Sequence, residues 1–258
     1  MKVLKVELEG LTASFRYPHF LVGRQPTYIM PPPATIYGHI CSACGEFVDP
    51  GLIRFGYCFR FEGKGDDFEH IYQAKVAGRY DKKLGCVKNI EAELVPVLRE
   101  LLLFPRMTLY IDAPAIIDML SESFRRPRYA VVLGRSQDLA AYRTADVIEL
   151  REDESGYFED TLLPWSYRTH TALGTAVLMP RFINPEDRRE VSWERYITLR
   201  HRVFYGAADE GEGANHMIRY EGDGPLWVDP ETPSVKDMRR AIAWHTFVDR
   251  DHGAEGVE

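Results

Sequence analysis

A rigid proline segment leads into a predicted helix whose first turn carries hydroxyl groups. Residues 31–33 are all proline, and apolar residues recur with helical spacing from Ile36 onward, so Thr35 is predicted to cap the helix. The free N–H groups and the positive dipole at a helix N-terminus favour a phosphate group. Thr35 and Tyr37 would add hydroxyl donors, and Gly38 would allow another chain to approach closely. The alternative interpretation is a capped helix that only packs.

A short polar loop follows a predicted buried strand at residues 129–133. Its residues are Gly134, Arg135, Ser136 and Gln137. Glycine permits an unusual backbone conformation, arginine offers a planar fork of donors, and the two polar side chains offer further hydrogen bonds. This combination fits a phosphate group or a base edge, although an ordinary polar loop has the same composition.

Aromatic and basic residues occur together near the N-terminus, and further basic residues gather at a predicted hairpin tip. The first group includes Phe15, Arg16, Tyr17 and Arg24, with Ser14 beside it, and the second is Lys82, Lys83 and Lys88. Aromatic surfaces beside cations are typical of sites that bind single-stranded nucleic acid. A solvated, exposed face is the alternative for the lysines.

The sequence carries no strong metal or cofactor motif. Cys41 and Cys44 form a CxxC, but no second pair with zinc-type spacing exists, and the small residues around them favour helix packing. The patterns HExxH, GxSxG, GxGxxG and GxxxxGKS/T are also absent. We therefore predict no metal site and no cofactor.

Charge is distributed unevenly over the 258 residues. The formal net charge is −7; residues 1–150 carry 19 Lys and Arg against 18 Asp and Glu, whereas residues 151–258 carry 13 against 21. A chain-wide basic footprint for nucleic acid is therefore absent, and any polyanion site must be local. No apolar run approaches the roughly 20 residues of a membrane span, and four cysteines are too few for a disulfide scaffold. With no signal-peptide pattern at the N-terminus, these features predict a cytoplasmic protein without a membrane partner.

Hydrophobic periodicity predicts an α+β fold. The predicted elements are strand 3–9, helix 35–47, strand 52–61, a hairpin with one arm at 70–80 and its tip at 81–89, helix 91–103, strand 107–111, a helix from Pro114 and strand 129–133. The resulting order is β-α-β, an insertion and β-α-β. That order is typical of ferredoxin-like domains, including the RRM-like platforms of RNA-binding proteins.

The second half is predicted to be a smaller β-rich module. Short strands with Gly and Pro punctuation occur between residues 144 and 228, and residues 234–247 are predicted to form a helix capped by Ser234. We therefore place a ferredoxin-like domain at residues 1–143, with an insertion at about 63–104, and the C-terminal module at 144–258.

Three short segments resemble one protein family. Residues 11–16 contain ASFR, residues 31–38 are PPPATIYG, and residues 133–137 contain LGRS. They resemble signature segments of CRISPR-associated protein family 5, within the RAMP superfamily, and the length and style are most similar to its type I-B branch. Residues 144–258 resemble the family's variable C-terminal part only loosely.

The resemblance implies a subunit of Cascade, the crRNA-guided interference complex of CRISPR antiviral defence. Such proteins have a ferredoxin-like N-terminal domain, hold the repeat-derived 5′ handle of the crRNA and cap the filament of backbone subunits. A thumb hairpin, here about residues 70–90, contacts RNA and the adjacent backbone subunit. The large subunit docks nearby and takes part in PAM recognition, so target DNA would be reached indirectly through the ribonucleoprotein complex.

We therefore predict a non-catalytic crRNA-binding subunit. The predicted RNA-binding residues are Ser14, Phe15, Arg16, Tyr17, Arg24, Thr35, Tyr37, Gly38, Lys82, Lys83, Lys88, Arg135, Ser136 and Gln137.

Two alternative hypotheses remain open. One branch of the family cleaves precursor crRNA with a Tyr and a Lys-His pair; Tyr37 could stand for that Tyr, but the chain has no Lys-His dipeptide, and Arg200-His201 is the nearest likeness. A metal-independent endoribonuclease would use Tyr37 and His201 as acid–base groups. A protein-only adaptor would instead act through the acidic C-terminal half.

Overall fold

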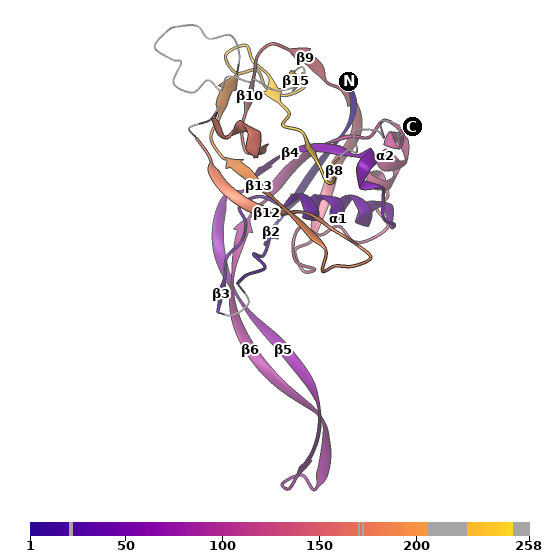
Figure 1. The fold of residues 1–258 in the computed structure, drawn as a ribbon, viewed down its shortest axis with the longest axis vertical. Helices are drawn as coiled ribbons and strands as arrows, with labels where there is room; N and C mark the ends of the chain where they lie inside the picture. The colour runs from indigo at the N-terminus through magenta and orange to yellow at the C-terminus, as the bar shows by residue number, and fades with distance from the viewer. Residues whose placement is uncertain (21–22, 170, 172, 206–225, 250–258) are drawn as a thin grey trace, which may run out of the picture.

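Four antiparallel strands form the centre of the molecule. The computed structural model describes residues 1–20, 23–169, 171, 173–205 and 226–249. The central strands lie in the order β4 (Arg54–Arg60), β7 (Arg106–Asp112), β1 (Lys2–Gly10) and β8 (Ala140–Glu149) (Figure 1). Strands 3–9 and 52–61 were predicted from their alternating patterns and strand 107–111 from its β-prone residues, and the structure has a strand in each place.

Alternation explains why one face of this sheet is covered by helices. On β1, Leu4, Val6 and Leu8 are buried, whereas the side chains between them face the other way and are half-buried. The apolar face packs against α1 (Pro33–Cys44) and α2 (Ile117–Arg125). The second helix was predicted from its apolar spacing after Pro114.

The N-cap of helix α1 lies three residues before the predicted one. Pro32 is its N-cap and Pro33 its first residue, and no side chain caps it. The predicted cap at Thr35 is wrong, because the backbone N–H of Thr35 already donates to the carbonyl of Pro32 at 2.8 Å. Proline has a fixed φ that fits the first helical turn, so the proline run itself starts the helix.

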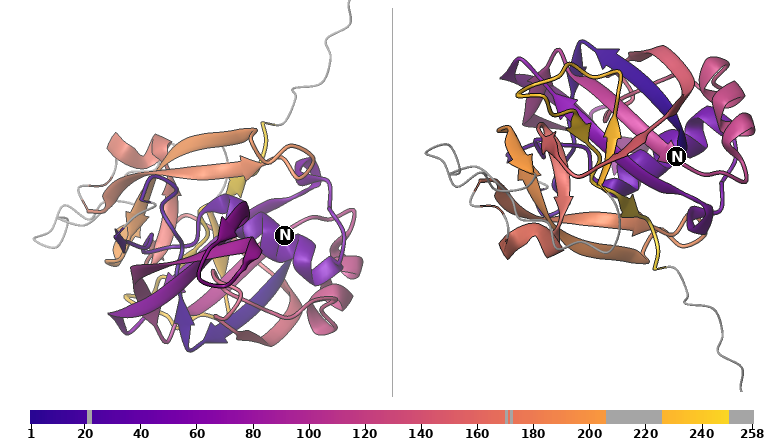
Figure 2. Two further views of the ribbon diagram at one scale, coloured as in Figure 1. Left: turned by 90° about the horizontal axis from the view of Figure 1, so that it is seen from below. Right: turned by 90° about the horizontal axis from the view of Figure 1, so that it is seen from above.

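Strands from the C-terminal half extend the central sheet. Three of them continue it beyond β4: β11 (Thr161–Pro164), β13 (Val191–Leu199) and β12 (Thr175–Ile183). The short β17 (His245–Thr246) pairs with another part of β4. Helix α1 lies between the central strands and the β12–β13 pair (Figure 2). The domain boundary predicted at residue 143 falls inside β8 and does not coincide with a break in the sheet.

A smaller sheet covers part of the helix-free face. Its order is β14 (Val203–Tyr205), β10 (Gly156–Phe158), β16 (Arg240–Ala241), β15 (Leu226–Asp229) and β9 (Arg151–Asp153). Its apolar side chains, with those of β11 and β13, form a second hydrophobic cluster. Two short 3-10 helices lie in the connections: Pro50–Leu52 between α1 and β4, and Trp165–Thr169 between β11 and β12.

A long two-stranded hairpin projects from the body, as Figure 1 shows. It consists of β5 (Gly63–Asp81) and β6 (Cys86–Leu103), and short strands β2 (Thr12–Ala13) and β3 (Arg24–Gln25) pair with the base of β6. The helix predicted at 91–103 is therefore wrong. Pro96 would interrupt a helix, and the leucines and valines that mimic helical spacing pair instead with β5.

Two further predicted elements are wrong. Residues 129–133 are not a strand and form only an isolated bridge from Val132 to Leu139; the strand that pairs with β1 is β8. The helix predicted at 234–247 is replaced by the short strands β16 and β17, which are held by long-range pairing that local spacing does not reveal. Within the described residues, no helix is long and apolar enough to cross a bilayer.

Two histidines are buried in the body as neutral groups. His39 on α1 shares a hydrogen bond of 2.9 Å with the hydroxyl of Tyr142, and a ring nitrogen of His245 lies 2.9 Å from the carbonyl oxygen of Leu162. Burial lowers the pKa of each histidine from 6.5 to about 4. The folded state therefore favours the neutral form of each histidine over the protonated form.

We predict that stability falls as the pH is lowered from 6.5 to 4. In that interval the unfolded chain binds protons at His39 and His245 while the folded chain does not, so each histidine removes up to about 3 kcal/mol of unfolding free energy. Urea unfolding at pH 7, 6 and 5 measures this loss. His39→Gln should reduce the slope of unfolding free energy against pH by about 1.4 kcal/mol per unit near pH 5. An unchanged slope would contradict the assignment of His39.

Candidate nucleic-acid interface

Two of the sequence motifs are in direct backbone contact. Gly134 has a φ of +105°, and a Cβ on it would lie 2.5 Å from the carbonyl oxygen of Ser14. Only glycine fits this contact. Ser14 is buried, and its hydroxyl donates to the carbonyl of Glu100 at 2.9 Å. The ASFR segment, the LGRS loop and the base of the hairpin therefore form one continuous structure.

Arg135 holds the base of the hairpin through ion pairs. Its guanidinium donates to Asp138 at 2.7 and 2.8 Å, to Asp67 at 2.9 Å and also to Glu69. Asp138 is fully buried and accepts a further hydrogen bond, of 2.5 Å, from the hydroxyl of Thr12. The hydrogen bonds with Asp138 raise the pKa of Arg135. This arginine faces three carboxylates and thus has a structural role that its sequence context did not reveal.

The rest of the LGRS loop lies at the surface. Ser136 and Gln137 are exposed, and the Gln137 amide donates to Glu69 at 2.9 Å. The loop therefore presents side-chain hydroxyl and amide groups beside the hairpin base, while the charge of Arg135 is neutralised inside.

The aromatic and basic segment after β2 is divided between the core and the surface. Phe15 is buried, and its ring packs edge-to-face on Phe59 with ring centroids 5.6 Å apart. It therefore has no face open for stacking with a base. Tyr17 is half-buried and packs on Tyr28 with ring centroids 3.6 Å apart. Arg24 is exposed but pairs with Asp66 at 3.1 Å. Arg16 is exposed, and within the described residues its side chain has no ion pair.

An apolar cavity of about 260 Å³ lies beside Arg16. Phe15, Arg16 and Thr35 contribute to its wall, together with Trp193 from β13. Trp193 is 38% exposed and stacks against His19 with ring centroids 5.7 Å apart. We call this site the Trp193 cavity. It offers a flat aromatic surface, a cation and the first turn of α1 within one small area, a combination that suits a nucleobase and its phosphate.

Trp193 was missed by the sequence analysis. Locally, Trp193 is an ordinary residue of a strand segment, β13. It reaches the cavity because β13 pairs with β12, where Pro180 lies opposite it. The segments that meet here are more than 140 residues apart, so sequence spacing did not connect them.

Tyr37 and Gly38 are not part of this cavity wall. Tyr37 is buried between Phe182 and Phe247, and its hydroxyl donates to the carbonyl of Val48 at 2.7 Å. Burial raises the pKa of Tyr37, which disfavours the phenolate that a general base would need. Gly38 is exposed, and no atom of the chain lies within 4 Å of a Cβ built on it, so the chain itself makes no close approach there.

His201 and the cysteines also stand apart from the cavity. His201 is exposed in the bend after β13. Cys41 is buried and Cys44 half-buried within α1. Among the described residues, no group of three or more His, Cys, Asp or Glu side chains is arranged to hold a metal ion.

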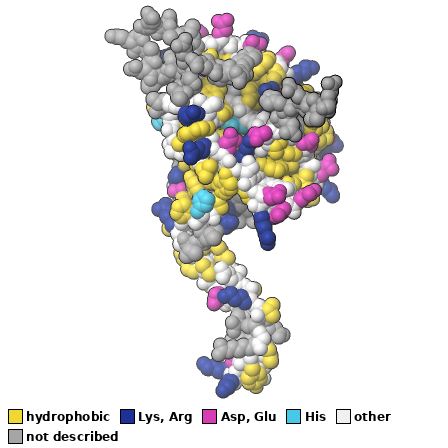
Figure 3. Space-filling model, in the orientation of Figure 1, with side chains coloured by type: hydrophobic (Ala, Val, Ile, Leu, Met, Phe, Trp, Pro, Cys, Tyr) yellow, Lys and Arg dark blue, Asp and Glu magenta, His cyan; other side chains and the backbone are white. Residues whose placement is uncertain are grey.

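The predicted basic tip lies at the far end of the hairpin. Lys82 and Lys83 are exposed in the turn between β5 and β6, and Figure 3 shows basic side chains at this end of the molecule. The side chain of Lys88 lies outside the described residues. The predicted RNA-binding residues therefore occupy separate places: the Trp193 cavity, the hairpin base, the core of the body and the hairpin tip.

Comparison with known protein families identifies the chain. The family model described as CRISPR-associated protein (Cas_Cas5) matches residues 3–222. The chain belongs to this Cas5 family. No curated protein that was compared matches the sequence significantly.

Solved structures resemble this Cas5-family chain at low sequence identity. A chain from a "CRISPR RNA-guided surveillance complex" is 15% identical, with a TM-score of 0.50 over 76% of this chain and 88% of that one. A CRISPR protein from Archaeoglobus fulgidus is 10% identical, with a TM-score of 0.46 over 94% of this chain and 99% of that one.

The hairpin of this Cas5-family chain has one apolar and one polar face. Phe68, Tyr72 and Val76 lie on the same side of β5, and Leu94 of β6 is paired with Tyr72. All four are exposed, Tyr72 by 76% and Val76 by 93%. We call them the apolar ribbon face. The opposite face is mainly polar: it carries Asp67, Glu69, Gln73, Lys75 and Glu93, together with the half-buried Ile71–Val95 pair.

We predict that Arg135→Ala destabilises the body by about 3 kcal/mol, because it leaves the buried Asp138 without its cation. Urea unfolding at pH 7 measures the change. Arg125→Ala is the matched control: it also removes an ion pair, with Asp146, but both side chains are more than half exposed, so the cost should stay below about 1 kcal/mol. Equal effects of the two substitutions would contradict the structural role of Arg135.

Proposed function

We propose that this protein is a non-catalytic crRNA-binding subunit of a type I CRISPR Cascade complex, of subtype I-B. In this role it holds the 5′ handle of the crRNA and caps the filament of backbone subunits. The observation that carries the proposal is the Trp193 cavity, where an aromatic face, Arg16 and the start of α1 converge on a chain of the Cas5 family.

The cavity suits one nucleotide of a single strand. A base stacked on Trp193 would contribute roughly 1–3 kcal/mol, and stacking is tolerant of base identity. Arg16 would contact the adjoining phosphate, and the backbone N–H of Ala34 at the start of α1 would add a donor. A local site of this kind agrees with the acidic net charge of −7, which disfavours a broad nucleic-acid footprint.

The absence of catalysis is part of the proposal. The burial of Tyr37 and its hydrogen bond to Val48 argue against a phenolate at the surface, and His201 is not among the residues that line the Trp193 cavity. Cleavage of precursor crRNA would then fall to a separate processing subunit.

The hairpin supports the proposed assembly with protein partners. We interpret the order β4-β7-β1-β8, with α1 and α2 on one face, as a ferredoxin-like domain and the hairpin as its thumb. An apolar face on a projecting two-stranded ribbon is costly in water, so the apolar ribbon face would dock on the adjacent backbone subunit. Lys82 and Lys83 would then reach RNA at the tip. The large subunit, and through it target DNA, would complete the complex.

Replacing Trp193 tests the RNA site. We predict that Trp193→Ala weakens binding of a handle-sequence RNA roughly tenfold or more, because a base loses its stacking surface. Arg16→Gln should lower the slope of log affinity against log salt by about 0.7, because one phosphate contact is lost from a single strand. Fluorescence anisotropy with labelled RNA measures both quantities.

Tyr129→Ala removes another exposed aromatic ring, outside the cavity wall, and serves as the control. Handle affinity unchanged by Trp193→Ala and Arg16→Gln would exclude the cavity as the RNA site.

The apolar ribbon face is tested by charge insertion. We predict that Tyr72→Glu prevents incorporation into the assembled complex while leaving the affinity of the free subunit for handle RNA unchanged. Gln73→Glu places the same charge on the polar face of the same strand and should assemble normally. Co-purification of the tagged variants with backbone subunits provides the measurement. Equal incorporation of both variants would rule out docking through the apolar ribbon face.

A further inference from the structure

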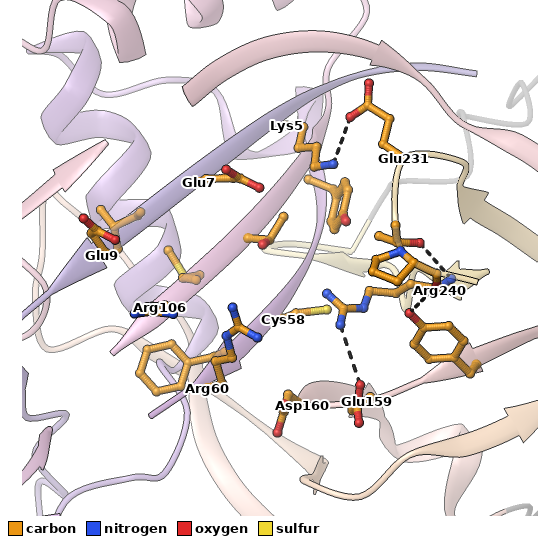
Figure 4. Close-up of a pocket in the computed structure, with 18 of the residues that line it drawn as sticks. Lys5, Glu7, Glu9, Cys58, Arg60, Arg106, Glu159, Asp160, Glu231 and Arg240 are labelled. Carbon is orange, nitrogen blue, oxygen red and sulfur yellow. Dashed lines mark hydrogen bonds and ion pairs between the residues drawn. The ribbon is translucent and has the colours of Figure 1, made fainter. Parts of the chain in front are cut away.

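A second cavity, of about 640 Å³, lies on the helix-free face of the central sheet. Its floor comes from β1, β4 and β7, and part of its wall comes from the small sheet and the segment around Pro233. Figure 4 shows Arg60 and Arg106 at one end and Lys5 with Glu231 at the other. Its volume falls within the range of small-molecule sites, about 300–1,000 Å³. None of its described lining residues belongs to the Trp193 cavity.

The sheet register places two arginines directly opposite each other at one end. Arg60 on β4 is paired with Arg106 on β7, and both side chains are exposed. Directly opposed residues on antiparallel strands have Cβ atoms about 4.5–5.5 Å apart, and like charges in that position destabilise the sheet. A bound anion would remove this repulsion.

The carboxylates near this end are paired with other arginines. Glu9 pairs with Arg143 at 2.8 Å, Glu159 with Arg202 at 2.8 Å, and Asp160 with Arg200 at 3.6 Å. Glu9 also lies opposite Arg106 in the register, and the charge of Arg60 acts on Asp160. Within the described part of the chain, however, Arg60 and Arg106 have no direct ion pair of their own.

These two guanidinium groups therefore form a local excess of positive charge with free bidentate donors, which match the oxygens of a phosphate.

The adjoining row of the floor has a different chemistry. Thr108 lies between Cys58 and Glu7 in the register, and Glu7 has no ion pair within the described residues. This row lies two residues along the strands from the row of Arg60 and Arg106. The Glu7 carboxylate would accept hydrogen bonds from an amino group. The floor thus presents phosphate-binding donors in one row and an acceptor in the next.

We propose that this second cavity binds a nucleotide, with its phosphate between Arg60 and Arg106 and an amino group of its base toward Glu7. The nucleotide is either free or the terminal residue of a strand, because both carry the same phosphate. The proposal rests on the cavity alone and is independent of the proposed crRNA role of the Trp193 cavity.

Calorimetric titration of the full-length protein tests the proposal. The probes are AMP, adenosine and a hexanucleotide with a 5′-phosphorylated adenosine. The wild type should bind AMP or the hexanucleotide, and adenosine at least tenfold more weakly, because it lacks the phosphate. Binding of AMP assigns a free nucleotide, and binding of the hexanucleotide alone assigns a strand terminus; either outcome supports a phosphate site.

Three variants locate the binding. The double substitution Arg60→Gln and Arg106→Gln should weaken the phosphate-dependent affinity at least tenfold. The double substitution Arg125→Gln and Arg126→Gln, which removes two exposed arginines of the α2 end, is the charge-matched control and should bind as the wild type does. Equal affinities of wild type and double variant, or binding of none of the probes, would overturn the proposal. Loss of AMP binding in Trp193→Ala instead would place the nucleotide in the Trp193 cavity and overturn it as well.

Discussion

The ion pairs of Arg135 are the constraint on which the arrangement of this protein depends. They connect three parts of the chain: the loop after α2, the first strand of the hairpin through Asp67 and Glu69, and strand β2 through the Asp138–Thr12 hydrogen bond. Because Asp138 is fully buried, its charge requires a cation there. The network sets where the hairpin leaves the body, and the adjacent contact of Gly134 with Ser14 sets the path of the segment that carries Arg16.

This anchoring separates the surfaces that the proposed function needs. The helix-covered side of the sheet forms the core, and the Trp193 cavity opens where α1, the segment after β2 and the β12–β13 pair meet. The hairpin carries the apolar ribbon face and the tip lysines away from the body (Figure 3). The exposed basic side chains that the proposed function uses are confined to a few sites. A chain with a net charge of −7 is therefore compatible with local binding of single-stranded RNA, as proposed.

The sequence predicted the elements whose local pattern agrees with their tertiary environment. It did not predict the elements that are determined by strand pairing between distant parts of the chain. Alternation predicted β1 and β4, β-prone residues predicted β7, and helical spacing predicted α1 and α2. Residues 91–103 satisfied a helical pattern but pair with β5, because the ladder along the hairpin outweighs local spacing. Arg135 was predicted as an RNA contact, yet its partners Asp67 and Glu69 come from a strand more than 60 residues away. Trp193 reaches the cavity only through the extended sheet, so no motif pointed to it.

The most direct test of the crRNA role is to purify the tagged protein from cells that express its whole operon and to sequence the RNA that accompanies it. The account predicts RNA with uniform 5′ ends that carry a repeat-derived handle, and a loss of that RNA from the free subunit when Trp193 and Arg16 are both replaced. Absence of RNA, or RNA whose 5′ ends do not derive from the repeat, would contradict the account and favour a protein-only adaptor.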